Sequence, residues 1–530
     1  MLNTLKLRSL FWTWACALLA LISACQPATQ GNDKHFRVNL GTEPPSLDWS
    51  LATDHVSFNV ISNLMVGLTE FDKDLKPVPV IAKSWEFQDG GKKIVFHLRD
   101  DVAWSDGRKV RAQDFEYSWK RLLDPKTAAQ YAYILFDLAN AQEYNEGKLK
   151  DSSSIGVQAQ DDQTLIVTLR HPASYFLAIT TFEVTFPQRQ DVVEKFGNRW
   201  TEPENIVTNG PFRLQSWRHE NQIELAANAG FFGGKPVLER ITMYMVNEKT
   251  TAVTMFEQGN LDFMDDHSIP PLDKPRLSKI PGYKLVPQLR GEYYAFAVER
   301  KPFDSPRVRK AFAMAIDREV LPKILQGGET AATSWIPPGM LAHNAEIGLK
   351  FNPDEARRLL KDAGFPGGKG LPPIVLGYNT DEEKKLVAEA VQSMWQKHLG
   401  VIVTIENHEW KVFLKKLQTD PFLVFRSGWG ADYPDPDNFM KLFTSNSGNN
   451  HSRWKNRRYD QLLEQAAREL DAKKRSRLYD EAQNILTEID TAIVPLYWKA
   501  EPTMLNPKFT GLEYNSMARM NLRNVKPAAK

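Results

Sequence analysis

The residues best placed to do chemistry lie in the stretch FRSGWGADYPDPDNF, residues 425–439. It holds a tryptophan between two glycines, Trp429, and an acid three positions later, Asp432. A carboxylate beside aromatic surface suits a cationic ligand group. The prolines that follow fix the segment in advance, so we interpret it as a preorganised binding surface.

Two further acids of this stretch raise the alternative of a calcium site. A calcium loop needs a glycine at its sixth position and a late bidentate glutamate. Counted from Asp435, these positions hold Met440 and Asn446, which disfavours calcium. Asp435 and Asp437 are equally well interpreted as solvated turn residues.

Catalytic motifs are missing from the sequence. It contains no G-x-x-x-x-G-K-[ST], no G-x-S-x-G and no H-E-x-x-H; the nearest approach, HEWKV at 408, lacks the second histidine. The ten histidines are scattered singly, without metal-ligand spacing. We therefore predict neither an enzyme nor a bound metal or cofactor. A cell-envelope peptidase or amidase stays the alternative from that class.

The N-terminus has the pattern of an export signal. Lys6 and Arg8 precede an apolar run at 10–22 that is too short to span a bilayer comfortably. The run leads into Ser-Ala-Cys, which resembles a bacterial lipoprotein box. We therefore predict a lipoprotein signal peptide at 1–24 and a lipid on Cys25, which would attach the protein to a membrane. An ordinary signal peptide with a chance cysteine is the alternative.

Composition limits the remaining classes. At 530 residues, with 42% hydrophobic and 25% charged residues, the chain is long enough for two or three lobes with a large core. A net charge of +2 without a long basic run gives no support for a nucleic-acid partner. The other cysteine, Cys16, lies in the signal, so the mature chain would have no disulfide.

Periodicity predicts the elements that position these residues. We expect a hairpin at 84–107, a helix at 112–125, a strand pair at 209–228 and a helix at 352–367. The last carries nearly all its boundary signals, with Asn352 as N-cap and with Gly364 and Pro366 ending the helix.

Helices and strands then alternate toward the stretch at 425–439. The pattern predicts a helix that closes at Gly400, a strand at 401–405, a helix at 410–417 and a strand at 422–426. The last is almost continuously apolar, as buried strands of α/β units are. The stretch at 425–439 would then leave the carboxyl end of a strand, where open α/β sheets bind ligands.

Read in order, several segments resemble the extracytoplasmic solute-binding proteins of peptide ABC importers, family 5, in the oligopeptide-binding branch. The segments are GTEPPSLDWSLATD, IAKSWEFQDGGKKIVFHLRDDVAWSDGRKVRAQDFEYSWKRLLDPKTA, NGPFRL, KPFDSPRVRKAFAMAIDRE, NPDEARRLLKDAGF, NHEWKVFL and RSGWGADYPDP. The resemblance implies an α/β, periplasmic-binding-protein-like (type II) two-lobe cleft fold with an extra inserted domain. Its domains would be domain I at 25–55, 181–289 and 500–530, inserted domain II at 56–180, and domain III at 290–499.

The resemblance also implies a ligand-binding site. Asp432 would pair with the α-amino group of a peptide, Trp429 would line the first side-chain pocket, and Gly428 would let the ligand approach the backbone. The other residues carried over are Arg426, Trp410, Glu43, Pro44, Pro45, Tyr131, Tyr293 and Tyr294.

The sequence departs from the family pattern at two pocket positions. Ala295 stands where an acid is often found, and Leu417 stands where a base is expected. The pockets therefore need not suit the charged side chains that other members favour. Pro44 and Pro45 also cannot donate hydrogen bonds to a ligand.

The implied function is a lipid-anchored extracytoplasmic protein that captures oligopeptides with a free N-terminal amine and delivers them to an ABC permease. We expect a monomer, on the periplasmic side of the membrane in a Gram-negative host. Other ligands of the family are alternatives: a dipeptide, a murein peptide, glutathione or a metal chelate. A signalling receptor on the same fold is another. A carbohydrate ligand, suggested by 14 tryptophans, is disfavoured because most of them fall at core-periodic positions.

Overall fold

An eleven-stranded sheet organises the computed structural model, which describes residues 34–173, 175–469 and 471–529. The strand order is β15, β14, β16, β12, β17, β11, β1, β10, β9 and β8, with β13 beside β17. The bounds are β1 His35–Asn39, β8 Phe212–Arg218, β9 Gln222–Ala227, β10 Arg240–Tyr244, β11 Phe263–Met264, β12 Tyr283–Phe296, β13 Thr330–Ala331, β14 Ile374–Asn379, β15 Val403–His408, β16 Val424–Gly430 and β17 Ile493–Leu505.

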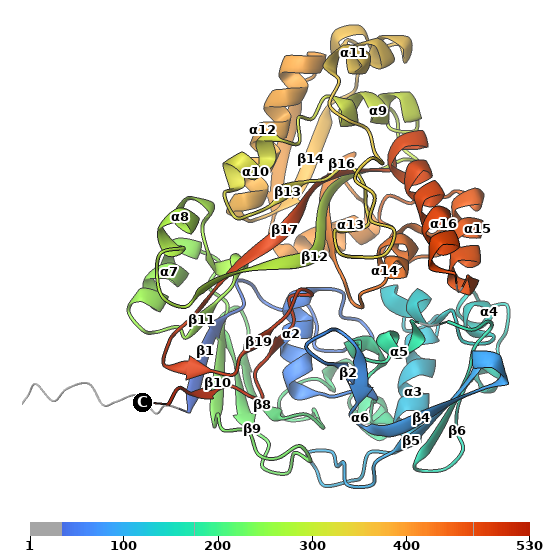
Figure 1. Ribbon diagram of the computed structural model, residues 1–530, viewed down its shortest axis with the longest axis vertical. Coiled ribbons are helices and arrows are strands. Elements are labelled where there is room, and N and C mark those ends of the chain that lie inside the picture. Colours follow the sequence, from blue (N-terminus) through green and yellow to red (C-terminus); the bar gives the residue numbers. More distant parts are fainter. Residues whose placement is uncertain (1–33, 174, 470, 530) are drawn as a thin grey trace, which may run out of the picture.

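Two long strands, β12 and β17, pair antiparallel in the middle of this sheet. Their ladder changes register between Pro287 and Gly291. We call residues 34–289 and 500–529 the first lobe and residues 290–499 the second lobe. Because β12 and β17 continue from one lobe into the other (Figure 1), they are the connections about which the lobes can rotate. The fold is thus the α/β two-lobe architecture expected from the sequence.

The first lobe carries a second, antiparallel sheet in the order β4, β5, β7, β6. Strands β4 and β5 form the hairpin predicted at 84–107, and β8 with β9 is the strand pair predicted at 209–228. The bounds are β4 Ala82–Gln88, β5 Lys93–Leu98, β6 Val157–Ala159 and β7 Thr164–Thr168. Two-stranded pairs add β2 Thr69–Phe71, β3 Pro77–Pro79, β18 Phe509–Thr510, β19 Glu513–Tyr514, β20 Met520–Asn521 and β21 Lys526–Pro527. This second sheet lies within 56–180; the predicted domain boundaries themselves stay a prediction.

Helices cover both sheets of the first lobe. In α3 the side chains of Phe115, Trp119 and Leu122 are fully buried, as their shared face predicts. The bounds are α2 His55–Leu64, α3 Ala112–Leu123, α4 Ala141–Asn145, α5 Phe176–Ile179, α6 Gln190–Phe196, α7 Lys249–Glu257 and α8 Lys274–Leu277, and a 3₁₀ turn η2 spans Gln130–Leu135.

The second lobe is built around three parallel strands, β15, β14 and β16. Its helix α11 begins as predicted, because Asn352 accepts a hydrogen bond from the Glu355 backbone N–H at 3.1 Å. The bounds are α9 Pro306–Met314, α10 Val320–Leu325, α11 Pro353–Asp362, α12 Glu382–Leu399, α13 Trp410–Thr419, α14 Pro436–Met440, α15 Arg457–Arg468 and α16 Ala472–Asn484, with a 3₁₀ turn η9 at Lys441–Phe443.

The stretch at 425–439 differs from its predicted form. The strand was expected to end at Arg426, but β16 runs to Gly430 because β12 pairs with it as far as Arg290–Gly430. The stretch also ends in a short helix, α14, which Pro436 starts and Asp435 caps. Strand β15 lies two to three residues later than predicted, at 403–408.

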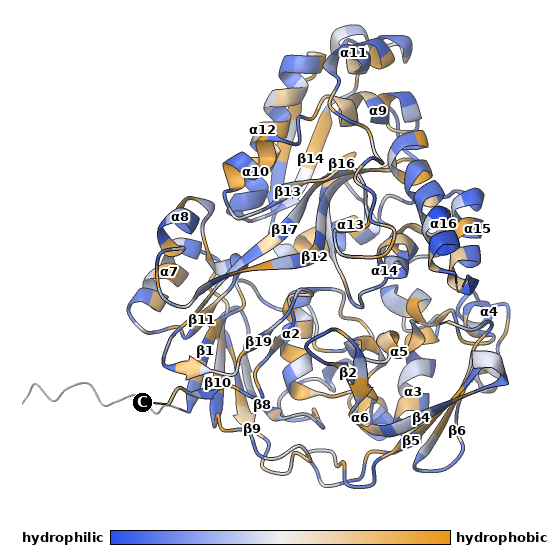
Figure 2. Ribbon diagram, in the orientation of Figure 1, coloured by the Kyte–Doolittle hydropathy of each residue, from blue (hydrophilic) through white to orange (hydrophobic). Residues whose placement is uncertain are grey.

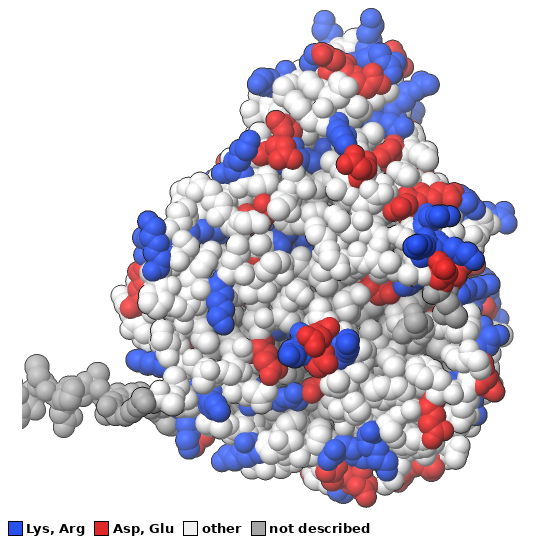
Figure 3. All heavy atoms as spheres, viewed as in Figure 1, with Lys and Arg blue, Asp and Glu red and all other residues white. Residues whose placement is uncertain are grey.

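Hydrophobic and hydrophilic residues are unevenly distributed over the elements. Figure 2 shows β14 as hydrophobic and α16 as mostly hydrophilic. On the face drawn in Figure 3, acidic and basic side chains are interspersed rather than gathered into one patch of a single sign. Among the described residues, no helix has the length and apolar character needed to cross a membrane. The predicted signal peptide at 1–24 and Cys25 lie outside the described residues.

Candidate ligand-binding site

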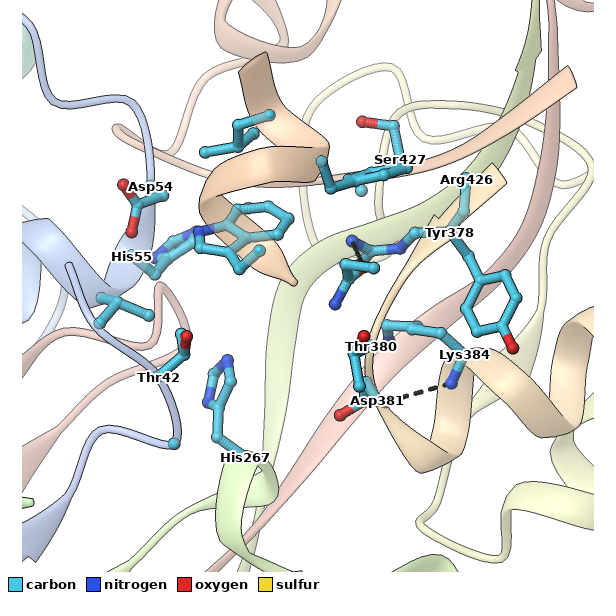
Figure 4. Close-up of a pocket in the computed structure, with 18 of the residues that line it drawn as sticks. Thr42, Asp54, His55, His267, Tyr378, Thr380, Asp381, Lys384, Arg426 and Ser427 are labelled. Atoms are coloured by element: carbon cyan, nitrogen blue, oxygen red, sulfur yellow. Dashed lines mark hydrogen bonds between the residues drawn. The ribbon is translucent and has the colours of Figure 1, made fainter. Parts of the chain in front are cut away.

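A cavity of about 590 Å³ lies between the two lobes. The first lobe contributes polar groups around Thr42, Asp54, His55 and His267, which face Tyr378, Thr380, Asp381, Lys384, Arg426 and Ser427 of the second lobe (Figure 4). Ligand sites for small molecules and short peptides fall in this size range.

The second-lobe wall is formed where its parallel strands end. Thr380 and Asp381 follow β14, Trp410 follows β15, and Asp432 follows β16; all four line the cavity. The predicted position at the carboxyl ends of strands is therefore confirmed for this segment.

Asp432 is the most deeply placed acid of the predicted set, at 4% exposed. Its Oδ2 accepts hydrogen bonds from the Tyr131 hydroxyl and the Asn438 amide, both at 3.1 Å. The nearest cation is Arg519, 3.6 Å from Oδ1, which also lies 3.1 Å from Glu183. Burial raises the pKa of Asp432 to about 7, although Arg519 and both hydrogen bonds oppose the shift. The carboxylate is thus incompletely compensated.

Strand β16 presents an unpaired backbone edge to the cavity. On one side it pairs with β12 from Val424 to Gly430. On the other side β14 pairs only with Val424 and Phe425. Neighbouring backbone groups of a strand point to alternate sides, so within the described chain the outward N–H and C=O groups of 426–430 are free to pair with an added strand.

Aromatic rings flank the carboxylate. Trp429 and Tyr131 lie 5.8 Å apart between ring centroids, and Tyr131 packs edge-on against Phe182 at 4.9 Å. The Trp429 indole donates to Asn438 Oδ1 at 3.1 Å, and the Asp432 backbone N–H donates to the same oxygen at 3.0 Å. Asn438 therefore orients both predicted residues. Sequence reasoning missed it, since nothing in its context marks it among the polar residues of α14.

Arg426 lines the cavity but already has an acidic partner. Its guanidinium donates to Glu292 at 2.8 and 2.5 Å and to Asn379 at 3.0 Å. A Cβ on Gly428 would lie 2.7 Å from the Glu292 carboxylate. Gly428 lines the cavity as predicted, but its missing side chain makes room for this ion pair, whereas we expected it to make room for a ligand.

A buried network of ion pairs forms much of the polar wall and was not predicted. Lys249 of the first lobe lies 3.0 Å from Asp381 of the second lobe. Further contacts of the network include Lys384–Glu383 at 2.8 Å, Lys499–Glu383 at 2.8 Å, Lys274–Asp266 at 3.1 Å and Arg290–Glu501 at 3.3 Å. These charges come from six different segments, so no local pattern could reveal them. Each of these side chains has an oppositely charged partner within the network.

Helix α13 supplies an apolar wall. Trp410, Phe413 and Leu417 line the cavity together with Tyr293 of β12. Leu417 is 2% exposed, and Ala295 is completely buried two residues from Tyr293 on the same face of β12. Neither position that departs from the family pattern places a charge in this wall.

Four of the carried-over residues are not among the lining residues. Tyr294 points to the opposite face of β12 from Tyr293, where it packs 6.2 Å from Trp395. Glu43 instead accepts from His219 at 2.6 Å and from the Glu220 backbone N–H at 3.1 Å. Pro44 and Pro45 follow it; the cavity is reached just before them, by Gly41 and Thr42.

The two acids after Asp432 are structural. Asp435 accepts two hydrogen bonds from Arg475, at 2.8 and 2.7 Å. Asp437 is completely buried beside Lys441, so its interpretation as a solvated turn residue is wrong; α14 carries it into the interior. Among the described residues, no cluster of three or more His, Cys, Asp or Glu could hold a metal ion.

A family model and individual relatives assign this chain to the same protein family. Residues 76–451 match the family model of bacterial extracellular solute-binding proteins, family 5 Middle. The oligopeptide-binding protein OppA of Bacillus subtilis is 35% identical over 504 residues, covering 92% of each chain. The dipeptide-binding protein DppE of the same organism is 33% identical, covering 94% of this chain and 92% of its own.

Solved structures agree in fold. OppA of Haemophilus influenzae in complex with RPPGFSPFR superposes with a TM-score of 0.88 at 32% identity, covering 94% of this chain and 99% of that one. The murein tripeptide binding protein MppA of Escherichia coli gives 0.89 at 31% identity, with the same coverage. The unliganded open form of a periplasmic murein tripeptide binding protein MppA gives a TM-score of only 0.63 at 32% identity, covering 94% of this chain and 98% of that one. The lobes of this chain are therefore not arranged as in that open form.

Proposed function

This chain belongs to the bacterial extracellular solute-binding proteins of family 5, and on that premise we propose that it is the lipid-anchored peptide-binding component of an ABC importer. It captures short peptides with a free N-terminal amine between its lobes and delivers them, chemically unchanged, to an ABC permease. It works as a monomer outside the cytoplasm, held at the membrane by its N-terminal lipid.

The observation that carries this proposal is a buried carboxylate at the end of a free strand edge. A peptide extended along residues 426–430 would add a strand to β16 and gain main-chain hydrogen bonds that do not depend on its side chains. Its first residue would then lie beside Asp432, which lines the cavity two residues after the end of that strand.

The charge balance at Asp432 favours an ammonium ligand. A free α-amino group has a pKa of about 7.7–8.0, so it is cationic at neutral pH. Asp432, Glu183 and Arg519 together supply two acids and one base. A ligand amine would complete this set, whereas a metal chelate without an amine would not. A dipeptide, a murein peptide or glutathione fits the same chemistry, and ligand length separates them.

The proposed membrane attachment depends on Cys25, which directly follows the predicted signal peptide. Two or more acyl chains hold a protein stably at a bilayer. In the native host, wild type should incorporate labelled palmitate and sediment with membranes, whereas Cys25→Ser should incorporate none. A wild-type protein that incorporates no palmitate would reject the lipid.

The test of peptide binding is calorimetry on protein that starts at Gln26, freed of carried-over ligand by unfolding and refolding. A pool of short peptides should bind, and the same pool N-acetylated should lose at least 100-fold in affinity, about 3 kcal/mol, because Asp432 would face no charge. Equal binding of both pools would remove Asp432 from its role. Binding of neither would reject the peptide ligand.

A further inference from the structure

A cluster of buried polar side chains joins the two lobes outside the cavity. The Lys441 ammonium in η9 lies 2.8 Å from Asp137 of the first lobe and 3.0 Å from Asp437 of the second. Asp137 and Asp437 are 4% and 0% exposed. Lys441 therefore bridges two buried carboxylates that belong to different lobes.

Two tyrosines complete this cluster, and each lobe contributes one of them. The rings of Tyr175, first lobe, and Tyr433, second lobe, stack 6.1 Å apart at an interplanar angle of 10°. Tyr175 donates to Asp137 at 3.1 Å, and Tyr433 donates to Asp437 at 2.7 Å. Each lobe thus presents one tyrosine–carboxylate unit to the other. We call these five residues the lobe latch.

The electrostatics of the lobe latch depend on contact between the lobes. Burial works against the charged form of Asp137, but Lys441 and His171 outweigh it and lower the pKa of Asp137. Lys441 also lies over the Tyr175 ring, 5.0 Å from its centroid. If the lobes separated, the bridge from Lys441 to Asp137 and the tyrosine stack would both break.

None of the five residues lines the cavity, so the contacts of the lobe latch need no ligand. The next residue along the chain, Leu442, does line it, which connects the latch to the ligand wall. We propose that the lobe latch holds the lobes closed in the absence of ligand, and that Lys441 is a positioning residue that lengthens the lifetime of bound ligand. The second part rests on the proposed function; the first does not.

Lobe closure can be measured without any ligand. The protein from Gln26 onward has no cysteine, since Cys16 and Cys25 are the two in the sequence. Spin labels at Lys150→Cys and Glu464→Cys, both exposed and in different lobes, would report the inter-lobe distance by electron–electron double resonance. Ligand-free wild type should give mainly the short distance, and Lys441→Met should shift the population to a longer one.

A matched control and a second variant keep the test decisive. Lys350→Met removes an exposed lysine of the second lobe whose partner is Glu346 of the same lobe, and should leave the distances unchanged. Asp137→Asn, on the other lobe, should open the lobes as Lys441→Met does, and the double variant should open them no further. Identical distances in wild type, Lys441→Met and Asp137→Asn would overturn the latch.

Ligand release supplies the second readout. With a bound peptide from the calorimetric pool, Lys441→Met should raise the dissociation rate about tenfold, and it should also raise the association rate because more of the ligand-free protein is open to the ligand. A purely structural role would lower the thermal midpoint and leave both rates unchanged. If Lys441→Met opens the lobes but leaves the dissociation rate unchanged, the lobe latch would be supported and its effect on the lifetime of bound peptide would be rejected. If no peptide binds, the distance measurement still decides the latch.

Discussion

At the scale of single residues, Asp432 predicts how binding depends on pH. Burial raises its pKa to about 7, so below pH 7 the ligand-free carboxyl is mostly protonated and an incoming ammonium must displace that proton. Between pH 7.5 and 5.5 the peptide affinity should fall roughly twentyfold, the factor expected for one group of pKa about 7. Above pH 8 it should fall again as the ligand amine deprotonates.

Calorimetry across this pH range checks the prediction. Asp432→Asn, which keeps the size of the side chain and cannot titrate, should bind weakly with no drop below pH 7. A wild-type affinity that is constant from pH 5.5 to 7.5 would contradict the assigned role of the carboxyl.

Residues that line the cavity were easier to predict from the sequence than their partners. Trp429 and Asp432 lie three positions apart in one motif, so their types and spacing are visible locally. Glu292, the partner of Arg426, lies 134 positions away and meets it only because β12 and β16 are neighbours. Contacts of this kind depend on strand pairing, which residue spacing does not encode.

At the scale of elements, the free edge of β16 predicts sensitivity to the ligand backbone. If a peptide pairs with residues 426–430, N-methylation of an amide that donates to this edge should weaken binding roughly fivefold, the net value of one hydrogen bond. A series with one N-methyl group at successive positions should alternate between weak and strong effects. Uniformly small effects in calorimetry would argue against strand addition.

Helix α13 predicts side-chain preference. Leu417→Glu would place a carboxylate in the apolar wall beside Phe413 and Tyr293, so peptides with a phenylalanine in that pocket should lose about tenfold and lysine peptides should gain. Val412→Glu is the control, because Val412 is on the same helix and 53% exposed. Competition with a positional peptide library is the measurement. An unchanged ranking in Leu417→Glu would separate this wall from the ligand.

Element positions followed from sequence where the signals were local. Helix α11 begins at its N-cap and ends near Gly364 as predicted, because both signals are adjacent to it. The predicted end of β16 was four residues too early. The last half of this strand is stabilised by pairing with β12, which lies more than a hundred residues away in the chain.

At the scale of the whole molecule, a glycine contact predicts how fully the lobes close. A Cβ on Gly448 of the second lobe would lie 2.6 Å from the Gln130 backbone oxygen of the first lobe. Gly448→Ala should therefore lower the closed population and weaken peptide binding about tenfold. Gly230→Ala is the control, because its Cβ would meet only Asn228 Oδ1 at 3.6 Å. The two spin labels and calorimetry report both effects, and an unchanged closed population in Gly448→Ala would contradict the contact.

The cavity is walled by both lobes, which has a consequence for timing. A ligand enclosed in this way can leave only when the two lobes separate, however weakly it contacts the cavity walls. Weakly bound ligands should therefore share a minimum residence time. This minimum is the mean time that the lobes, which β12 and β17 connect, take to open once. Ligands at this limit would share one dissociation rate, so the protein would discriminate among them only through their association rates.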